Sequence, residues 1–279
     1  MRRGDDTDHG TLEQLEALDP SFRRSALNMF EAEIGSGDVE VVVDGLSDMD
    51  ADVRADAAEA LGRMGALSSA ADLKAALGDG DGEVRTQAAV ALIRLGDDSL
   101  FPQVVRSLRH DDPRVVLGAA VVLGRVADKR VVPNLVEAFQ TTHEEVGAAV
   151  AWALGQCQDP ACLPWLRAAV DQGFCVVHVC EAIGRIGDAS AAPSLLPKVQ
   201  SDAVNERAYA ARALGMLRFD VDDAGKGDAV AALQGCLNDD ARKVRLCAAI
   251  ALYELGEAVG QRQLALEVDS LDDDAPGQA

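Results

Sequence analysis

The side chains best suited to bind a metal or act as nucleophiles lie close together near the middle of the chain. Cys157, Cys162, Cys175, His178 and Cys180 all fall between positions 157 and 180. Thiolate and imidazole groups are ligands that Zn²⁺ prefers, and the cysteines usually come as CxxC-type pairs. No CxxC pair is present in this chain. Whether these residues serve chemistry or packing therefore depends on the elements that carry them.

A second candidate is an acidic, glycine-containing stretch, RFDVDDAGKGD at 218–228, whose carboxylates could bind Ca²⁺. A calcium-binding loop of the EF-hand type ends with a bidentate Glu at its twelfth position. Counted from Asp220, the twelfth position is Ala231. We therefore interpret 218–228 as a solvated acidic surface loop.

A sequence block that recurs seven times explains where the cysteines lie. It reads VRADAAEALGRMG at 53–65, VRTQAAVALIRLG at 84–96 and VRLCAAIALYELG at 244–256, with four further copies between. A leucine or isoleucine marks the phase of each copy: Leu61, Leu92, Leu123, Leu154, Ile183, Leu214 and Leu252. Successive markers are 29 to 38 residues apart, and most are 31 apart. Self-similarity at such a period is the signature of a solenoid.

Each copy has the spacing of an amphipathic helix. Counted from the marker, apolar residues occupy positions −8, −4, −3, 0 and +3, which share one helix face. Position −3 is a small residue in every copy, and this allows neighbouring helices to approach closely. Cys180 occupies position −3 of its copy, Cys175 position −8, and Cys157 position +3. The register therefore predicts that these cysteines pack as small hydrophobes in the core, with no metal site.

The segments between the copies predict a second, shorter helix in each repeat. Apolar stretches such as Phe101–Leu108 and Leu163–Val170 precede the next copy. Aspartates such as Asp79 and Asp239 follow these stretches, where they are expected to cap the next helix. Glycines at position +4 are expected to end the long helix: Gly65, Gly96, Gly187 and Gly256. The predicted fold is all-α, a right-handed α-solenoid of about seven helix pairs.

The expected domain organisation is one repeat array with short additions. The array spans 38–267 and contains the acidic insertion loop 218–228. Residues 11–37 are expected to form N-terminal capping helices after a disordered start at 1–10. Residues 268–279, VDSLDDDAPGQA, are expected to be a disordered acidic tail.

Composition restricts the partners. The chain has 26 basic and 47 acidic side chains, a net charge of −21, so nucleic acid and anionic membranes are unlikely partners because phosphates are bound by Lys and Arg. No run reaches the roughly 18 apolar residues of a membrane span, and no export signal follows the first residues. The few cysteines also fit a reducing compartment. We expect a cytoplasmic protein, and its acid-rich, lysine-poor surface indicates either a halophilic source or a GC-rich genome.

The repeat pattern VRxxAAxALGxLGD resembles the short HEAT-like repeats named after phycobilisome lyases, over residues 38–267. This resemblance implies a superhelix in which the second helix of each pair lines the concave surface. It also implies a possible role in bilin attachment or removal, although no residue identifies a bilin site. Some similar proteins are DNA glycosylases for alkylated bases, with a basic concave face that the net charge opposes. A similar hydroxylase family binds two irons through several His-Glu dyads, of which this chain has only His143–Glu144.

The predicted binding surface follows marker positions −5, −2 and +2, which lie away from the core positions of each second helix. Its centre is apolar and aromatic, with arginines along one side, a composition typical of interface hot spots. The predicted partner-binding residues are Val90, Arg94, Val121, Arg125, Trp152, Gln156, His178, Glu181, Arg185, Tyr209 and Arg212. The alternative is that Trp152 and the valines pack against neighbouring helices.

Arginines recur at position −7 as Arg54, Arg85, Arg207 and Arg245. A residue fixed in repeat phase usually serves stacking. We therefore interpret these arginines as a ladder to the loop aspartates between repeats, and not as a basic binding surface.

The sequence shows no nucleophile–base pair, phosphate-binding loop or metal cluster. It therefore predicts a non-catalytic scaffold or adaptor, without cofactor or metal, that binds a partner protein in the concave groove. Such a scaffold would suit a signalling, motility or assembly complex. The alternatives are a bilin lyase-like, chromophore-handling protein and, with less support, an alkyl-base DNA glycosylase-like protein.

Overall fold

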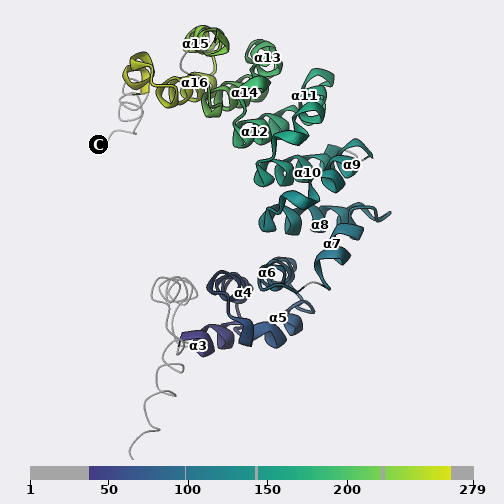
Figure 1. Ribbon diagram of the computed structural model, residues 1–279. Helices are drawn as coiled ribbons and strands as arrows, with labels where there is room; N and C mark the ends of the chain where they lie inside the picture. Colours follow the sequence, from purple (N-terminus) through teal and green to yellow (C-terminus); the bar gives the residue numbers. More distant parts are fainter. Residues whose placement is uncertain (1–37, 98, 142–143, 221–223, 265–279) are drawn as a thin grey trace, which may run out of the picture. The chain divides into compact units, whose positions relative to one another are not determined.

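The computed structural model describes residues 38–97, 99–141, 144–220 and 224–264, and these residues form helices joined by short turns (Figure 1). The chain divides into two compact units. One comprises the chain up to His110 together with Val121–Val126, and the other comprises Asp111–Ala120 and the chain from Ala127 onward. The predicted capping helices at 11–37 and the predicted disordered ends lie outside the described residues. No described helix has the length and apolar character needed to cross a membrane.

Each repeat is a pair of helices, of which the second carries the recurring block. The pairs are α3 (Asp38–Gly45) with α4 (Ala51–Met64), α5 (Ala70–Ala76) with α6 (Gly82–Arg94), α7 (Phe101–Ser107) with α8 (Pro113–Val126), α9 (Val132–Thr141) with α10 (Glu144–Cys157), α11 (Leu163–Gln172) with α12 (Val176–Ile186), α13 (Ala192–Leu195) with α14 (Val204–Met216), and α15 (Ala224–Cys236) with α16 (Arg242–Glu254). Short 3₁₀ turns are η1 (Leu67–Ser69), η2 (Lys129–Val131), η3 (Pro160–Cys162), η4 (Ala189–Ala191) and η5 (Leu196–Gln200). The predicted all-α solenoid of helix pairs is confirmed.

The core lies where the repeat register predicted it. All seven marker residues are at most 1% exposed, and every small residue at position −3 is buried. Leucine and isoleucine at the marker supply half of the largest fully buried side chains. Since burying such a side chain contributes roughly 1.5–3 kcal/mol, the markers account for much of the apolar stabilisation of the repeats.

Successive second helices approach closely at a glycine directly after the marker. Within the units, α4 packs on α6, α10 on α12, α12 on α14, and α14 on α16. A Cβ placed on the glycine at +1 would lie only 2.4 to 3.1 Å from the Cα of an alanine in the next repeat. The four pairs are Gly62–Ala91, Gly155–Ala182, Gly184–Ala213 and Gly215–Ala251. Only a residue without a side chain permits this helix spacing.

Four second helices end next to the glycine at +4, as the sequence predicted. Gly65, Gly96, Gly187 and Gly256 all have φ between 69° and 88°, the left-handed conformation of a helix C-cap. Ala127 (φ 57°) and Gln158 (φ 48°) take the same conformation at the equivalent position of their repeats. A residue with a Cβ costs roughly 1–2 kcal/mol in this conformation, so these two repeats retain the turn at the expense of stability.

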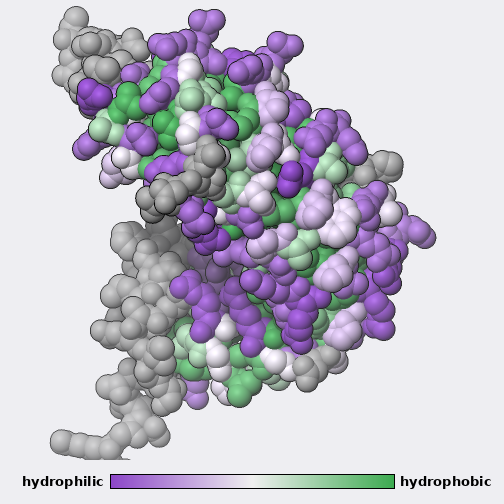
Figure 2. Space-filling view, turned by 45° about the horizontal axis from the view of Figure 1, so that its top comes forward, coloured by the Kyte–Doolittle hydropathy of each residue, from purple (hydrophilic) through white to green (hydrophobic). Residues whose placement is uncertain are grey.

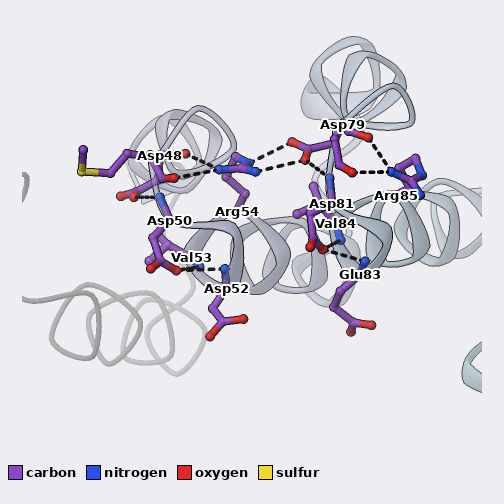
Figure 3. Close-up of polar contacts among 12 residues, drawn as sticks. Asp48, Asp50, Asp52, Val53, Arg54, Asp79, Asp81, Glu83, Val84 and Arg85 are labelled. Atoms are coloured by element: carbon purple, nitrogen blue, oxygen red, sulfur yellow. Dashed lines mark hydrogen bonds and ion pairs between the residues drawn. The ribbon is translucent and has the colours of Figure 1, made fainter.

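The repeated arginine at −7 joins neighbouring repeats (Figure 3). Nη1 of Arg54 donates to the carbonyls of Asp48 (2.8 Å) and Met49 (3.2 Å) in the preceding loop. Its Nε and Nη2 donate to the two carboxylate oxygens of Asp79 in the next repeat, at 2.8 and 3.0 Å. This bidentate pairing is the strong form of an arginine–carboxylate interaction.

The same arrangement recurs near the other end of the array. Arg207 binds the carbonyls of Ser201 and Asp202 and pairs with both carboxylate oxygens of Asp239 at 2.7 and 2.9 Å. Arg85 and Arg245 donate to the corresponding loop carbonyls of their own repeats. The interpretation of these arginines as a ladder to the loop aspartates of the next repeat is confirmed for Arg54 and Arg207. Arg85 and Arg245 are engaged with the backbone of their own loops.

The prediction that Asp79 and Asp239 cap the following helix is wrong. The N-cap of α6 is Asp81, whose carboxylate accepts from the amides of Glu83 and Val84, and the N-cap of α16 is Ala241, with no side-chain cap. Asp79 lies two residues before the cap, where its carboxylate accepts from the Asp81 amide (2.8 Å) and from Arg54. Asp79 therefore serves to pair with Arg54 of the preceding repeat, and not to cap α6.

The predicted insertion loop 218–228 is only partly a loop. Helix α15 begins at Ala224, so residues 224–228 form its first turn. Helix α15 buries Ala229 and Leu233 in the core. Its first residues, 224–228, precede these two buried side chains. At the start of the insertion, Arg218 is anchored to the previous repeat, because its amide and its Nη2 donate to the carbonyls of Gly187 (2.9 Å) and Ile186 (2.7 Å). Residues 221–223 lie outside the described residues.

Replacing Arg54 by Gln should lower the free energy of unfolding by about 1–2 kcal/mol, because hydrogen bonds to a charged group contribute about that much. The Arg54 and Asp79 side chains are only 18% and 14% exposed. Arg114→Gln is the matched control, since Arg114 is 91% exposed in its pair with Asp112, and it should change stability by less than about 0.5 kcal/mol. Urea unfolding of the three proteins measures both values.

The same comparison should depend on pH. The hydrogen bond from Arg54 holds the pKa of Asp79 below its ordinary value of 3.8. Stability from a carboxylate with a lowered pKa is present above the ordinary pKa and is lost as the pH falls through the lower folded value. The difference between wild type and Arg54→Gln should therefore be constant near neutral pH and shrink below pH 3.8. Equal losses in both variants, or a difference that does not change with pH, would contradict this account.

Candidate functional site

The candidate site is the face of the second helices that points away from the marker residues. Helices α6, α8, α10, α12 and α14 contribute the predicted partner-binding residues. Hydrophilic and hydrophobic side chains are interspersed on the surface shown in Figure 2. The exposed large hydrophobic residues of the described chain lie on several different helices and loops. They are Met49, Leu67, Val115, Trp165, Val204 and Tyr253.

In the first unit, one predicted binding residue is not at the surface. Val90 is only 2% exposed and packs in an apolar cluster with Ala89 and Val122. Leu100 and Val104, from the start of the next repeat, pack against the same cluster. Val90 is therefore a packing residue, as the alternative interpretation of the valines allowed, and it cannot contact a partner. Val121 is half-buried.

The polar residues of the same face form a connected network in the first unit. Nη1 of Arg125 lies 2.6 Å from Oε1 of Glu83, and Nη2 of Arg94 donates to the carbonyl of Arg125 at 2.9 Å. Nε2 of Gln87 donates to Glu83 (3.1 Å) and to Oε2 of Glu59 (3.4 Å). This network fixes the arginines of the predicted surface in position and gives Arg125 a carboxylate partner within the chain.

In the second unit the predicted residues keep contact with solvent. His178, Arg185 and Arg212 are exposed, and Trp152 and Tyr209 are half-buried. Gln156 and Glu181 are half-buried as well. This unit therefore presents two aromatic side chains and two arginines on successive second helices.

Tyr209 has a cationic neighbour that sequence reasoning did not single out. Nζ of Lys243, from α16, lies 4.7 Å from the centre of the Tyr209 ring and donates to Oδ1 of Asn205 at 2.8 Å. A cation over an aromatic face contributes about 0.5–1 kcal/mol at an exposed site. No spacing rule connects Tyr209 and Lys243, because the contact depends on how α14 and α16 stack.

The glycines at +1 also determine where the side chains at +2 lie. In the second unit, each of these glycines leaves a notch in its helix, which the +2 side chain of the next repeat covers. In the second unit, Cδ of Arg185 lies 3.4 Å from a Cβ built on Gly155, Sδ of Met216 lies 3.1 Å from one built on Gly184, and Oε2 of Glu254 lies 3.1 Å from one built on Gly215. The glycine belongs to the repeat pattern, but this role is visible only in the structure.

Cys157, Cys175 and Cys180 lie in the core, as the repeat register predicted. Cys157, Cys162, Cys175, Cys180 and Cys236 are buried, and Cys247 is half-buried. Burial raises the pKa of Cys157 and Cys175 to about 11 and that of Cys162 and Cys180 to about 12. Because the thiolate is the form that attacks or binds metal, these thiols are poorly suited to either task.

In the part of the chain that the structure describes, no group of three or more His, Cys, Asp and Glu side chains could hold a metal ion. Glu144 is exposed at the start of α10, whereas His143 lies outside the described residues.

The sequence pattern that defines HEAT repeats matches residues 10–93, 39–122, 70–150 and 102–174, which together make up more than half of the chain. The chain belongs to the HEAT-repeat family. The predicted HEAT-like repeats are thus confirmed. In the structure, each repeat is a helix pair with a buried marker residue. The comparison with curated protein sequences found no match to this chain.

Several solved structures are similar to this HEAT-repeat protein at low sequence identity. The CpcE–CpcF complex of phycocyanin lyase from Nostoc sp. PCC7120 is 22% identical, covers 86% of this chain and 98% of its own, and has a TM-score of 0.45. Human deoxyhypusine hydroxylase in complex with glycerol is 19% identical, with coverages of 88% and 96% and a TM-score of 0.38. An engineered protein is 19% identical, with coverages of 94% and 82% and a TM-score of 0.45.

The burial of the thiols predicts their reactivity. In the native protein, a thiol reagent such as DTNB should modify only Cys247 rapidly, because the other five cysteines are buried. All six should react once the protein is unfolded in denaturant. The variant Cys247→Ser should remove the rapid phase and leave the rest unchanged. Rapid modification of Cys175 or Cys180 in the native protein, detected by mass spectrometry, would contradict their assignment to the core.

Proposed function

We propose that this HEAT-repeat protein is a non-catalytic scaffold that binds a partner protein on the exposed face of its second helices. The observation that carries the proposal is the second unit, where Trp152, Arg185, Tyr209 and Arg212 occupy that face without belonging to the core. Stacking uses the marker, the small residues at −3 and the glycine at +1, and Arg185 lies over the notch at Gly155. Stacking therefore does not account for Trp152, Tyr209 and Arg212. Aromatic residues and arginine are the types that contribute most to protein–protein interfaces.

The family and the chemistry of the described residues support the same proposal. HEAT repeats stack into extended surfaces of the kind that bind other proteins. The raised pKa values of Cys157, Cys162, Cys175 and Cys180 make these thiols weak candidates for nucleophiles. Free cysteines fit a reducing compartment, and we place the protein and its partner in the cytoplasm.

In the first unit, Arg94 and Arg125 occupy the corresponding face of the second helices. Their side chains are held by the network of Glu83 and the Arg125 carbonyl, so they are ordered before a partner arrives. Ordering a long side chain on binding costs about 0.5–1.5 kcal/mol. Because Arg94 and Arg125 are already held in position, binding a partner should lose less free energy to ordering their side chains than with mobile arginines.

Affinity capture from a lysate of the source organism, at its native salt, tests the proposal. The bait should be wild type beside Trp152→Ala, Arg185→Glu, which removes an aromatic side chain and reverses a charge on one face. Trp165→Ala is the matched control, because Trp165 is 39% exposed on the first helix α11. Thermal unfolding should show that all three baits are folded.

A partner protein retained by wild type and by Trp165→Ala, and lost by the double variant, is the expected result. With the purified partner, the double variant should raise Kd by at least about tenfold, or about 1.4 kcal/mol. Equal retention by all three baits would contradict the proposed face. Retention of a coloured small molecule, and of no protein, would contradict the scaffold and favour the chromophore-handling alternative.

A further inference from the structure

Cationic and aromatic side chains meet where α14 packs on α16 in the second unit (Figure 1). Tyr209 and Arg212 are one turn apart on α14, and Nζ of Lys243, from α16, lies 4.7 Å from the centre of the Tyr209 ring. Burial raises the pKa of the Cys247 thiol, and the positive charges of Arg212 and Lys243 oppose this shift. Both cations therefore lie near the same half-buried thiol. We call Tyr209, Arg212 and Lys243 the cationic seam.

The two cations of the seam have no acidic partner in the part of the chain that the structure describes. Lys243 donates to a neutral acceptor, Oδ1 of Asn205, at 2.8 Å, and Arg212 forms no ion pair with a described residue. Both side chains are exposed. Arg54 and Arg207, by contrast, each have a carboxylate oxygen within 2.8 Å. The seam thus presents two uncompensated positive charges in a chain with a net charge of −21.

The carboxylates of the same face leave this charge in place. Glu181 on α12 and Glu254 on α16 occupy marker positions −2 and +2 of their repeats. Among the described residues, neither forms an ion pair with Arg212 or Lys243. Oε2 of Glu254 lies instead over the notch at Gly215, 3.1 Å from a Cβ built there. The seam is therefore suited to a segment with several carboxylates.

The chain itself has such a segment shortly after α16. Residues 269–274 read DSLDDD, with four carboxylates in six positions, and no basic residue occurs between 263 and 279. Residues 265–279 lie outside the described part of the chain. Charge complementarity between two uncompensated cations and four consecutive or nearby carboxylates favours this segment as the occupant of the seam.

The acidic segment is close enough to reach the seam. A Cβ built on Gly260 would lie 2.7 Å from the carbonyl oxygen of Ala249, so the chain lies against α16 at this point. Lys243 is six residues before Ala249, or about 9 Å along the helix. The eight residues from Leu264 to Asp272 can span up to about 26 Å, which exceeds this distance and the helix diameter of about 10–12 Å.

We propose that the acidic segment 269–274 binds the cationic seam of its own chain and competes there with the partner protein. The competition rests on the proposed scaffold function, because Tyr209 and Arg212 belong to the proposed partner-binding face. A segment tethered by a short linker has an effective concentration on the order of 1 mM. A contact with an intrinsic Kd of about 100 µM would then keep the seam occupied about nine-tenths of the time.

A peptide of residues 265–279, labelled with rhodamine and followed by fluorescence anisotropy, tests the contact in the full chain at about 0.15 M salt. The segment variant carries Asp269→Asn, Asp272→Asn, Asp273→Asn and Asp274→Asn, which free the seam. It should bind the peptide with a Kd on the order of 100 µM, about tenfold more tightly than wild type. Equal binding by the two chains, or no binding by the segment variant up to about 1 mM, would overturn the proposal.

A matched control separates occupation of the seam from net charge. It neutralises four exposed carboxylates elsewhere: Glu40→Gln, Asp44→Asn, Asp72→Asn and Asp171→Asn. This control should bind the peptide as weakly as wild type does. Binding as tight as that of the segment variant would overturn the proposal, because net charge alone would then explain the gain.

Reversal of the charges locates the contact. In the segment variant, Arg212→Glu with Lys243→Glu should abolish binding of the peptide. The same chain should bind a peptide with Asp272→Lys, Asp273→Lys and Asp274→Lys, a gain that loss of folding cannot produce. Unchanged binding of the original peptide by the reversed seam would contradict this location.

Partner capture distinguishes this proposal from the scaffold. The segment variant should retain more partner than wild type, because its seam is free. Equal retention would overturn the competition. Failed peptide binding, together with capture that still depends on Trp152, would remove the segment contact and leave the scaffold in place.

Discussion

The contact between a glycine in one second helix and an alanine in the next is the constraint on which the rest of the structure depends. It brings two helix backbones together at Gly62–Ala91, Gly155–Ala182, Gly184–Ala213 and Gly215–Ala251. At this spacing the marker residues interlock in the core, and an arginine at −7 such as Arg54 can reach the aspartate of the next repeat. In the second unit, the +2 side chains lie over the notches. The side chains on the outer face of the second helices take little part in stacking, so they can differ between repeats and serve to bind a partner.

The second repeat departs from this rule, and the division of the chain into two units falls in the repeat that follows it. Ile93 stands where the other stacked repeats have glycine, and Val122 stands where they have alanine. Both are larger, and both pack with Val90 in a separate apolar cluster. The same substitution explains why Val90 is buried: extra apolar side chains at this junction gather around it instead of leaving it on the face. Packing that occurs in this repeat and not in the others thus decides that Val90 is buried and cannot contact a partner.

Periodicity in the sequence predicts the features that each repeat forms alone or with an identical neighbour. The helix pairs, the buried markers such as Leu154, the left-handed glycines such as Gly187 and the buried Cys180 all follow from one register. The errors concern contacts whose partners lie in another repeat. Asp79 pairs with Arg54 instead of capping α6, Val90 is covered by residues of the next repeat, and the Tyr209–Lys243 contact has no signature in spacing. The first turn of α15 was missed because glycine and aspartate in 224–228 are poor helix formers, and the buried anchors that follow outweigh them.

Comparison of Gly215→Ala with Gly235→Ala tests the central claim most directly. Both glycines are helical, but a Cβ on Gly215 would lie 2.4 Å from Cα of Ala251, whereas a Cβ on Gly235 meets nothing within 4 Å. The free energy of unfolding should fall by about 1–3 kcal/mol or more for Gly215→Ala because α14 and α16 are forced apart. It should rise, by up to about 1 kcal/mol, for Gly235→Ala through helix propensity. A Gly215→Ala protein as stable as wild type or more stable would contradict the account.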